Sequence, residues 1–462
     1  MAIKGESSMV VRITFTGFMR QTQDRISTAV GMLFSHGLQE FGMLRCAIVL
    51  IYAGCTFPIG NQSESPGVSG DAGPAASPSP AVAKHALLLV VDTLRADALA
   101  AAETPHLDAI AARGDAVERA WSSSTWTVPS VVSVLTGMPV RQHGWNLPTG
   151  RIGSYPPLPS APTLATVLQG AGFGTFGIYA NPYLAEQLGF DRGFETWRRS
   201  SDQSIPKIFA SHVEEQWGDG RRHFAYVHLI GPHSPLKPSA AAAARWGVDP
   251  SWLGDSRGLG IGSAKRNREA GVREAYRAAY HAVIEDTDAR VGALMAALGA
   301  HRDETVVVVV SDHGEMLGEH NKVGHGTMVY EPLTHVPFLV DRGSLPQTLG
   351  IASAPAVLTG RLGVAHAWPT AADAALPLVS QREGMLALSV DGKRKGIWEE
   401  GSFLAYDLEG DPAELRPLGP DQALEGARAM WEDAVAPGGA LADEVTLHQD
   451  TIEELRAMGY LE

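Results

Sequence analysis

Three side chains that could bind a metal ion follow two apolar segments of the chain. Asp92 closes the segment that starts at His85, and Asp312 and His313 close the segment that starts at Thr305. Both segments are typical of strands buried on both faces of a parallel sheet, whose carboxyl ends meet at the ligand-binding edge of α/β proteins. We therefore expect the three side chains to lie together, where two carboxylates and an imidazole suit a hard or borderline divalent cation. Taken singly, each aspartate could instead cap the element that follows it.

A hydroxyl group that could act as a nucleophile precedes an apolar helical segment. The sequence from Ser122 reads SSSTWTVPSVVSVLTG, with Thr127 in front of Val128 and Pro129. We expect Thr127 to be the N-cap of a helix, since threonine caps well and proline is tolerated in the first turn. Capping alone would explain this residue. A nearby metal ion and the positive end of the helix dipole would, however, favour ionisation of the hydroxyl and activate it for attack.

The segments that must position these residues alternate between strand and helix patterns. Apolar runs of strand length start at His85, Gly174, His223, Thr305 and His335. Between the runs that start at His223 and Thr305, apolar residues recur at three- and four-residue steps over residues 276–298. This spacing predicts one long amphipathic helix that ends at Gly299. This alternation predicts an α/β fold.

Composition narrows the class of protein. The chain has 462 residues, with 51 acidic against 37 basic side chains and a net charge of −14. This acidic balance, without a long basic run, argues against sequence-independent nucleic-acid binding. The only cysteines are Cys46 and Cys55, which excludes a disulfide framework or a thiolate zinc site in the body of the chain.

The N-terminal region resembles an export signal. No window reaches the roughly 18 to 20 apolar residues of a membrane-spanning helix. The segment MLRCAIVLIYAGC over residues 43–55 is similar to a bacterial lipoprotein signal, with small residues before Cys55. Residues 56–84 are rich in Gly, Ser, Pro and Ala and are typical of a flexible linker. We therefore expect an exported protein, periplasmic or at the cell surface, attached to the membrane through a lipid on Cys55, although a short apolar segment without targeting value is the alternative.

Several motifs in order resemble one known family. They are LLLVVDTLRADAL from Leu87, TPHLDAIAARG from Thr104, TWTVPSVVSVLTGMPVRQHG from Thr125, SDHGEMLGEHNKVGHGTMVYE from Ser311 and AYDLEGDPAE from Ala405. Over residues 86–415 the chain is similar to the sulfatase family of the alkaline phosphatase superfamily. This resemblance implies a mixed, mostly parallel sheet flanked by helices, with a small C-terminal α+β subdomain that holds strands near 393–400 and 402–407. The implied organisation is a leader over 1–55, a linker over 56–84, a catalytic domain over 85–380 and a C-terminal subdomain and tail over 381–462.

The resemblance also assigns roles to individual residues. Asp92, Asp312 and His313 match family metal ligands, and Thr127 falls at the position of the nucleophile, beside the metal. In sulfatases that position is a Cys or Ser that becomes formylglycine within Cys/Ser-X-Pro-X-Arg, whereas here the segment reads TVPSV. We expect no formylglycine, because the β-carbon of threonine already carries a methyl group. An alkoxide mechanism remains, which in related enzymes serves phosphate mono- or diesters, phosphonates and phospho-group transfer.

Three further residues match positions near the substrate in the family. His233 corresponds to a histidine near the substrate anion or leaving group, and His325 replaces a common lysine and could donate to the leaving oxygen. Asn181 could supply an amide to a non-bridging oxygen, or it could simply form an Asn-Pro turn. Gly231 stands where an acid is usual before Pro-His, and no Asp-to-His spacing for a second metal is found. The sequence therefore favours one divalent ion, Mn²⁺, Ca²⁺, Mg²⁺ or Zn²⁺, with manganese slightly preferred.

Several functions fit this set of residues. The first is metal-dependent hydrolysis of anionic esters, with phosphate esters or phosphonates favoured through Thr127. Sulfuric ester hydrolysis, transfer of a phospho-headgroup to a glycan or lipid at the membrane, and an inactive binding protein are the alternatives. The expected partners are a small anionic ester or a glycan or lipid headgroup and, through the lipid anchor, the membrane.

Overall fold

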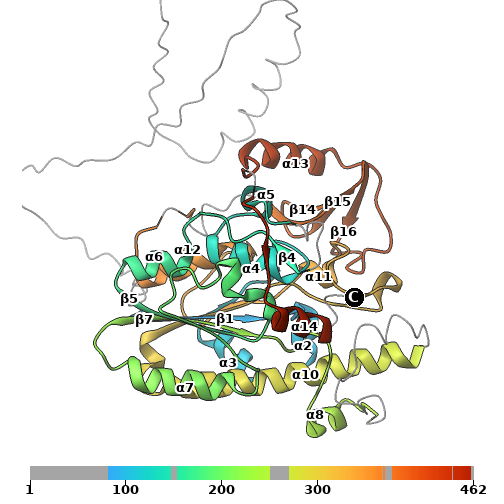
Figure 1. Cartoon of the computed structure of the whole chain (residues 1–462). Coiled ribbons are helices and arrows are strands. Elements are labelled where there is room, and N and C mark those ends of the chain that lie inside the picture. The colour runs from blue at the N-terminus through green and yellow to red at the C-terminus, as the bar shows by residue number, and fades with distance from the viewer. Residues whose placement is uncertain are drawn as a thin grey trace, which may run out of the picture. The chain divides into compact units, whose positions relative to one another are not determined.

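A seven-stranded sheet carries the candidate metal ligands (Figure 1). The structure is a computed structural model that describes residues 82–146, 153–249, 270–366, 368–369, 377–439 and 441–458. The strand order is β2-β11-β8-β1-β7-β5-β6. Their bounds are β1 His85–Val91, β2 Asp115–Ala116, β5 Phe173–Tyr179, β6 Thr196–Arg199, β7 Arg222–Leu229, β8 Thr305–Ser311 and β11 Phe338–Val340. The expected leader, the lipid attachment at Cys55 and all but the end of the expected linker lie outside the described residues.

The sheet is mostly parallel, as predicted. β8, β1, β7, β5 and β6 run in one direction, and β11 is antiparallel to β8. In register, Val91 of β1 faces Ser311 of β8, so the residues that follow these two strands emerge side by side. Four of the five expected strands begin within one residue of the predicted start. The fifth is shorter than expected, because His335 ends the short helix α11 (Glu331–Thr334) before β11 begins.

Helices cover both faces of this sheet, which explains the continuous apolar runs. Leu88 and Val90 point into a core with α4 (Thr127–Thr136), α6 (Leu164–Gly170) and α12 (Ala354–Leu362). Leu87 and Leu89 point into the opposite core with α3 (Pro105–Arg113), α7 (Ile205–Gln216) and α10 (Ala270–Ala297). In Figure 1 the first group lies above the sheet and the second below it. The site at the strand ends thus rests on a rigid, doubly covered layer.

The long helix predicted from the sequence is confirmed as α10. It ends at Ala297, close to Gly299, whose φ of 50° is the left-handed conformation that glycine adopts readily at helix ends. Within the described ranges, no helix combines the length and apolar character needed to span a bilayer.

A second, smaller sheet forms the C-terminal subdomain. Its antiparallel strands are β13 (Leu378–Arg382), β14 (Met385–Ser389), β15 (Arg394–Glu399) and β16 (Ser402–Asp407). Helix α13 (Gln422–Ala434) packs on one face through Leu424 and Trp431. β15 and β16 confirm the two strands expected near 393–400 and 402–407, while β13 spans the domain boundary expected at residue 380.

The first strand of this sheet binds directly to the segment that leads into α4. The main-chain N–H of Gln381 donates to the carbonyl of Ser123 at 2.9 Å, and the Ser124 hydroxyl donates to the carbonyl of Gln381 at 2.6 Å. Beneath the sheet, Lys395 is fully buried between two acids, with Nζ 3.1 Å from Glu331 Oε1 and 2.9 Å from Glu414 Oε1. Hydrogen bonds and a buried ion pair therefore fix the subdomain beside Thr127.

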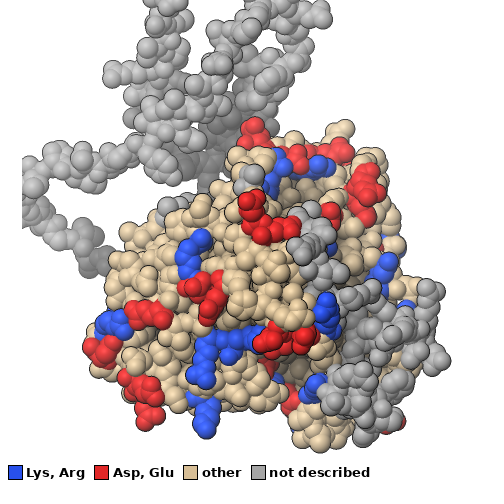
Figure 2. Space-filling model, viewed as in Figure 1, with Lys and Arg blue, Asp and Glu red and all other residues tan. Residues whose placement is uncertain are grey.

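The remaining elements are short, and the charges on the visible face are mixed. Figure 2 shows acidic and basic side chains interspersed on this face rather than gathered into a patch of one sign. The other elements are α2 Ala96–Ala101, β3 Arg119–Trp121, α5 Val140–His143, β4 Ser154–Tyr155, η1 Pro182–Leu184, η2 Glu186–Leu188, α8 Ala240–Arg245, η4 Gly299–Glu304, β9 Met316–Leu317, η5 Glu319–Asn321, β10 Val323–Gly324, β12 Thr348–Gly350, η6 Ile351–Ser353, β17 Val445–Thr446 and α14 Gln449–Ala457.

Candidate active site

Asp92, Asp312 and His313 lie together at the carboxyl ends of β1 and β8, all fully buried. Each carboxylate has one oxygen in hydrogen bonds and one without. Asp92 Oδ1 and Asp312 Oδ2 have no hydrogen-bond partner among the described residues, and they lie 3.7 Å and 3.6 Å from His313 Nε2. Buried oxygens without donors are costly, so the arrangement calls for a cation between them.

The tautomer of His313 suits metal binding. Its Nδ1–H donates to the carbonyl of Gly314 at 2.9 Å, which leaves the lone pair of Nε2 directed toward the two aspartates. Burial, the nearby His325 and smaller effects lower the pKa of His313 to about 3, so the ring is neutral at pH 7. One nitrogen and two carboxylate oxygens thus form a donor set that fits a divalent ion.

The two aspartates carry opposite pKa shifts. Burial would raise the pKa of Asp92, but a hydrogen bond from His228 and the charges of neighbouring histidines lower it below its usual range. The pKa of Asp312 is raised well above its usual range by burial and by the negative charge of Asp92. Two carboxylates this close do not both ionise readily without a cation, and a divalent ion between them would remove that conflict.

Thr127 is the first residue of α4, not its N-cap as expected. Trp126 occupies the cap position in an extended conformation and makes no side-chain capping bond. The Thr127 hydroxyl therefore does not serve the helix end. Its Oγ1 lies 3.4 Å from His313 Nε2 and 3.3 Å from Asn181 Nδ2. The hydroxyl faces the metal ligands from the positive end of the helix dipole.

Asn181 forms the expected turn, and its amide donates to the carboxylate of Asp92, while a role at a substrate oxygen stays a prediction. Its Oδ1 accepts the N–H of Tyr183 at 3.0 Å and caps the short helix η1, while its Nδ2 donates to Asp92 Oδ2 at 2.7 Å. Turn formation orients the amide toward the ligand shell. The same Asp92 oxygen lies 3.2 Å from Nε2 of His228, whose Nδ1 lies 3.0 Å from the hydroxyl of Tyr226.

His233 and His325 lie beside His313 and form a group of three imidazoles. The ring of His325 is centred 4.5 Å from that of His313 and 4.9 Å from that of His233. Burial lowers the pKa of His233. The main-chain amides of Ile230 and Gly231, just before His233, donate to Asp202 at 2.8 and 2.9 Å, and this carboxylate fixes the loop.

Two acids near this group were not identified as site residues from the sequence. Glu315 is fully buried, with its oxygens 3.2 and 3.3 Å from Nδ1 of His325, although its polar loop suggested solvent exposure as readily as a role in the site. Asp202 follows the edge strand β6 and has no distinctive motif around it. The sequence could have indicated Glu315, because it follows Asp312 and His313 in the run DHGE. It offers no comparable indication for Asp202.

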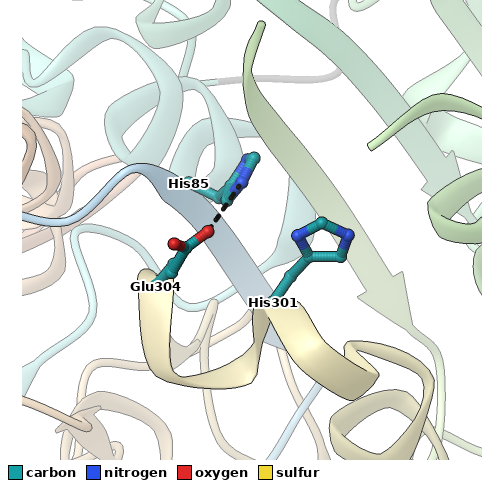
Figure 3. Close-up of side chains that lie close together, drawn as sticks. All are labelled: His85, His301 and Glu304. Carbon is teal, nitrogen blue, oxygen red and sulfur yellow. Dashed lines mark ion pairs between the residues drawn. The ribbon is translucent and has the colours of Figure 1, made fainter. Parts of the chain in front are cut away.

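A second group of metal-binding residue types lies at the opposite, amino-terminal edge of β1 and β8. Figure 3 shows His85 and Glu304 paired, with His301 beside them. However, Nδ1 of His85 accepts the main-chain N–H of His223 at 3.1 Å, so Nε2 of the neutral ring carries the proton and has no lone pair for a metal. Lys84 Nζ also lies 3.8 Å from Glu304. The donor chemistry therefore favours the Asp92 group over this one.

Comparisons with known proteins agree with the geometry. A model of the family described as Sulfatase matches residues 84–355. The chain belongs to the sulfatase family. An arylsulfatase from Clostridium perfringens is 24% identical over 332 residues, covering 56% of the chain and 69% of that protein. The low-salt glycan biosynthesis sulfotransferase Agl7 of Haloferax volcanii is 24% identical over 289 residues, covering 58% of each.

Solved structures show the same fold. A 2-O GAG sulfatase aligns with a TM-score of 0.60 at 17% identity, covering 76% of the chain and 92% of that protein. A phosphonate monoester hydrolase of Agrobacterium radiobacter aligns with a TM-score of 0.57 at 18% identity, covering 76% and 94%. The predicted family and fold class are confirmed: this is a sulfatase-family hydrolase of ester bonds, and Asp92, Asp312 and His313 form a group that could hold a metal ion.

Proposed function

We propose that the enzyme hydrolyses phosphate esters or phosphonates, with Thr127 as the nucleophile. The observation that carries this proposal is the Thr127 hydroxyl, unused as a helix cap and 3.4 Å from His313 Nε2. A divalent ion held by Asp92, Asp312 and His313, of which Mn²⁺ is favoured, would supply Lewis acidity that lowers the pKa of this hydroxyl.

The residues around Thr127 suit nucleophilic substitution at phosphorus. Thr127 Oγ1, ionised as the alkoxide, forms a bond to phosphorus while the bond to the leaving oxygen breaks, and protonated His325, held by Glu315, gives that oxygen a proton. Water then attacks phosphorus and gives one proton to His325, and the bond to Oγ1 breaks, which restores the alkoxide and the protonated imidazole. Asn181 donates to Oγ1 at 3.3 Å, and the paired rings of His233 and His325 would face the leaving group.

The side chain of threonine favours phosphorus over sulfur. A sulfo-threonine must be hydrolysed by fresh attack of water on a poorly electrophilic sulfur, whereas the formylglycine diol of sulfatases expels sulfate by internal elimination. Because threonine offers no such elimination, turnover of a sulfate ester should stall after one cycle.

The test is a panel of aryl phosphates, phosphodiesters, phosphonates and sulfates with added Mn²⁺, Ca²⁺ or Zn²⁺. We expect multiple turnovers on phosphorus esters and none on sulfates. Thr127→Ser should retain part of the activity and Thr127→Ala nearly none, while Thr136→Ala at the far end of α4 serves as the matched control. Fast turnover of an aryl sulfate with inert phosphates would refute the proposal.

Two other activities are supported by named relatives. The Clostridium protein is an arylsulfatase, which favours sulfuric ester hydrolysis as the second candidate. The Haloferax protein is a sulfotransferase, which supports group transfer to a glycan or lipid acceptor as a further candidate. Product that forms with an added acceptor but not with water would select transfer. A binding protein without activity is disfavoured because the complete donor set is present.

We also propose export and lipid attachment at Cys55, supported by the signal-like segment before it and the Gly/Ser/Pro-rich residues after it. Cys55→Ala should move the enzyme from the membrane fraction to the soluble fraction, with Cys46→Ala as control. Soluble cytoplasmic protein that retains Met1 would contradict this proposal.

A further inference from the structure

An arginine of the C-terminal subdomain reaches the segment that contains the proposed nucleophile. Arg382 lies at the end of β13, the strand whose neighbouring residue Gln381 is hydrogen-bonded to Ser123 and Ser124. Its guanidinium carbon lies 5.9 Å from the centre of the Trp126 ring, and Trp126 directly precedes Thr127. The position of Arg382 is therefore set by main-chain contacts next to the active site.

The same guanidinium also contacts the loop that carries His325. Its Nε donates to the carbonyl of Gly326, the residue after His325, and its Nη1 donates to the carbonyl of Asn146 at 3.3 Å. The N–H of Gly326 in turn donates to the carbonyl of Thr125 at 2.8 Å. Arg382 thus lies between the neighbours of Thr127 and the neighbour of His325, the two groups proposed to act on the ester.

This arginine has no ion-pair partner among the described residues, and the carboxylate of the adjacent Glu383 acts on it only from a longer distance. Both of its hydrogen bonds go to carbonyls, and none of the described carboxylates lies within ion-pair distance of it. Burial lowers the pKa of Arg382, in keeping with a cation that is partly removed from water. In contrast, Arg428 of the same subdomain also lies over a tryptophan, Trp398, but pairs with Glu432 at 2.8 Å.

Two buried polar groups of the segment that precedes Thr127 also have no hydrogen-bond partner among the described residues. The indole Nε1 of Trp126, a residue only 7% exposed, donates to nothing in the described part of the chain, and the Oγ1 of fully buried Thr125 has no hydrogen bond there. A buried donor that no protein group accepts is costly to fold, so it points to a ligand group. An unpaired cation and an unused N–H together suit an anion.

We propose that Arg382 and Trp126 form a subsite for a second anionic group, a carboxylate or sulfate, on the alcohol part of the substrate. This subsite rests on the proposed ester hydrolysis, since the alcohol part must extend from Thr127 toward His325 and Arg382. The preferred substrate is then an ester whose leaving group carries its own negative charge, such as an acidic sugar, rather than a neutral alcohol.

Matched esters test this subsite. Phenyl phosphate and 4-carboxyphenyl phosphate, and the corresponding pair of sulfates, differ only in the second anion. We expect Arg382→Gln to lower kcat/KM for the carboxylated ester by roughly tenfold to a hundredfold more than for the neutral one, the range of a charge-assisted hydrogen bond. Arg382→Lys should keep part of this preference, Trp126→Phe should lose a smaller part, and Arg428→Gln should change neither ester.

Binding measurements separate this proposal from the proposed chemistry. Calorimetry on the Thr127→Ala enzyme should show tighter binding of 4-carboxyphenyl phosphate than of phenyl phosphate, and Arg382→Gln in that background should remove the difference. An equal loss for both esters would overturn the subsite and leave Arg382 as a support for the His325 loop. If the wild type turns over neither pair, the proposed function fails while the calorimetric difference still decides the subsite.

Discussion

Two buried groups of this enzyme each bring two carboxylates together, and they differ in the source of the cation. Between the main domain and the C-terminal sheet, Lys395 lies between Glu331 and Glu414. At the ends of β1 and β8, Asp92 and Asp312 face the neutral ring of His313, and no lysine or arginine among the described residues forms an ion pair with them. The first group carries its cation in the chain, and the second would take a metal ion from solution.

This difference separates a structural site from a chemical one. The Lys395 ammonium contacts Glu331, Glu414 and the hydroxyl of Thr334, which uses its three N–H donors and leaves none for a substrate, so this group holds the subdomain in place. A divalent ion in the Asp92 group would still offer positions to Thr127 and to a substrate oxygen. The two groups should therefore respond differently to substitution, one by loss of metal and activity and the other by loss of stability.

The largest effect is expected at the active centre. Asp312→Asn removes one ligand charge and should lower activity by roughly a thousandfold or more, since a catalytic metal contributes several kcal/mol. The same change relieves the conflict with Asp92, so in EDTA the variant should melt higher than the wild type. Elemental analysis should show loss of the metal, and Mn²⁺ should raise the Tm of the wild type alone. Asp92→Ala and His313→Ala should also lose the metal. Metal content equal to that of the wild type in these variants would contradict the assignment.

A large loss of stability, without loss of metal, is expected at the subdomain. Lys395→Met leaves buried Glu414 without its cation and leaves Glu331 to the more distant Arg119 at 3.7 Å, which costs about 3 to 5 kcal/mol of unfolding free energy. Lys393→Met is the matched control, because its pair with Glu409 is exposed on both sides and should matter little. Chemical denaturation measures both variants. If the metal content of folded Lys395→Met also falls, the two groups are not independent.

The sequence predicted the active centre better than the subdomain contact, for physical reasons. Asp92 and Asp312 follow uninterrupted apolar strands, so their place at one sheet edge follows from strand direction alone. Lys395 stands in a run, KRK, that is typical of an exposed strand, and its burial depends on Glu331 from a distant helix. The sequence gives no sign of a role for Arg382 either, because its position depends on the hydrogen bonds between β13 and residues 123 and 124. A local sequence pattern predicts a strand and the edge at which it ends, but it does not predict which distant segments pack against that strand.

The smallest effect is a pH dependence confined to the subdomain contact. Burial raises the pKa of Glu414 to about 7 from 4.5, against the opposing charge of Lys395 and with the added charge of Glu331. The folded state therefore holds a proton that the unfolded chain has released, so this group's contribution to stability should fall as pH rises from 4.5 to 7, by at most ~3 kcal/mol.

Glu414→Gln keeps an acceptor for the N–H of Glu331 and cannot ionise. The difference in unfolding free energy between variant and wild type, measured in EDTA at several pH values, should grow in favour of the variant across this range. The exposed control Glu409→Gln should give no such trend, and a flat difference for Glu414→Gln would show that Lys395 keeps this carboxylate ionised, making the group as fully paired at pH 5 as at pH 8.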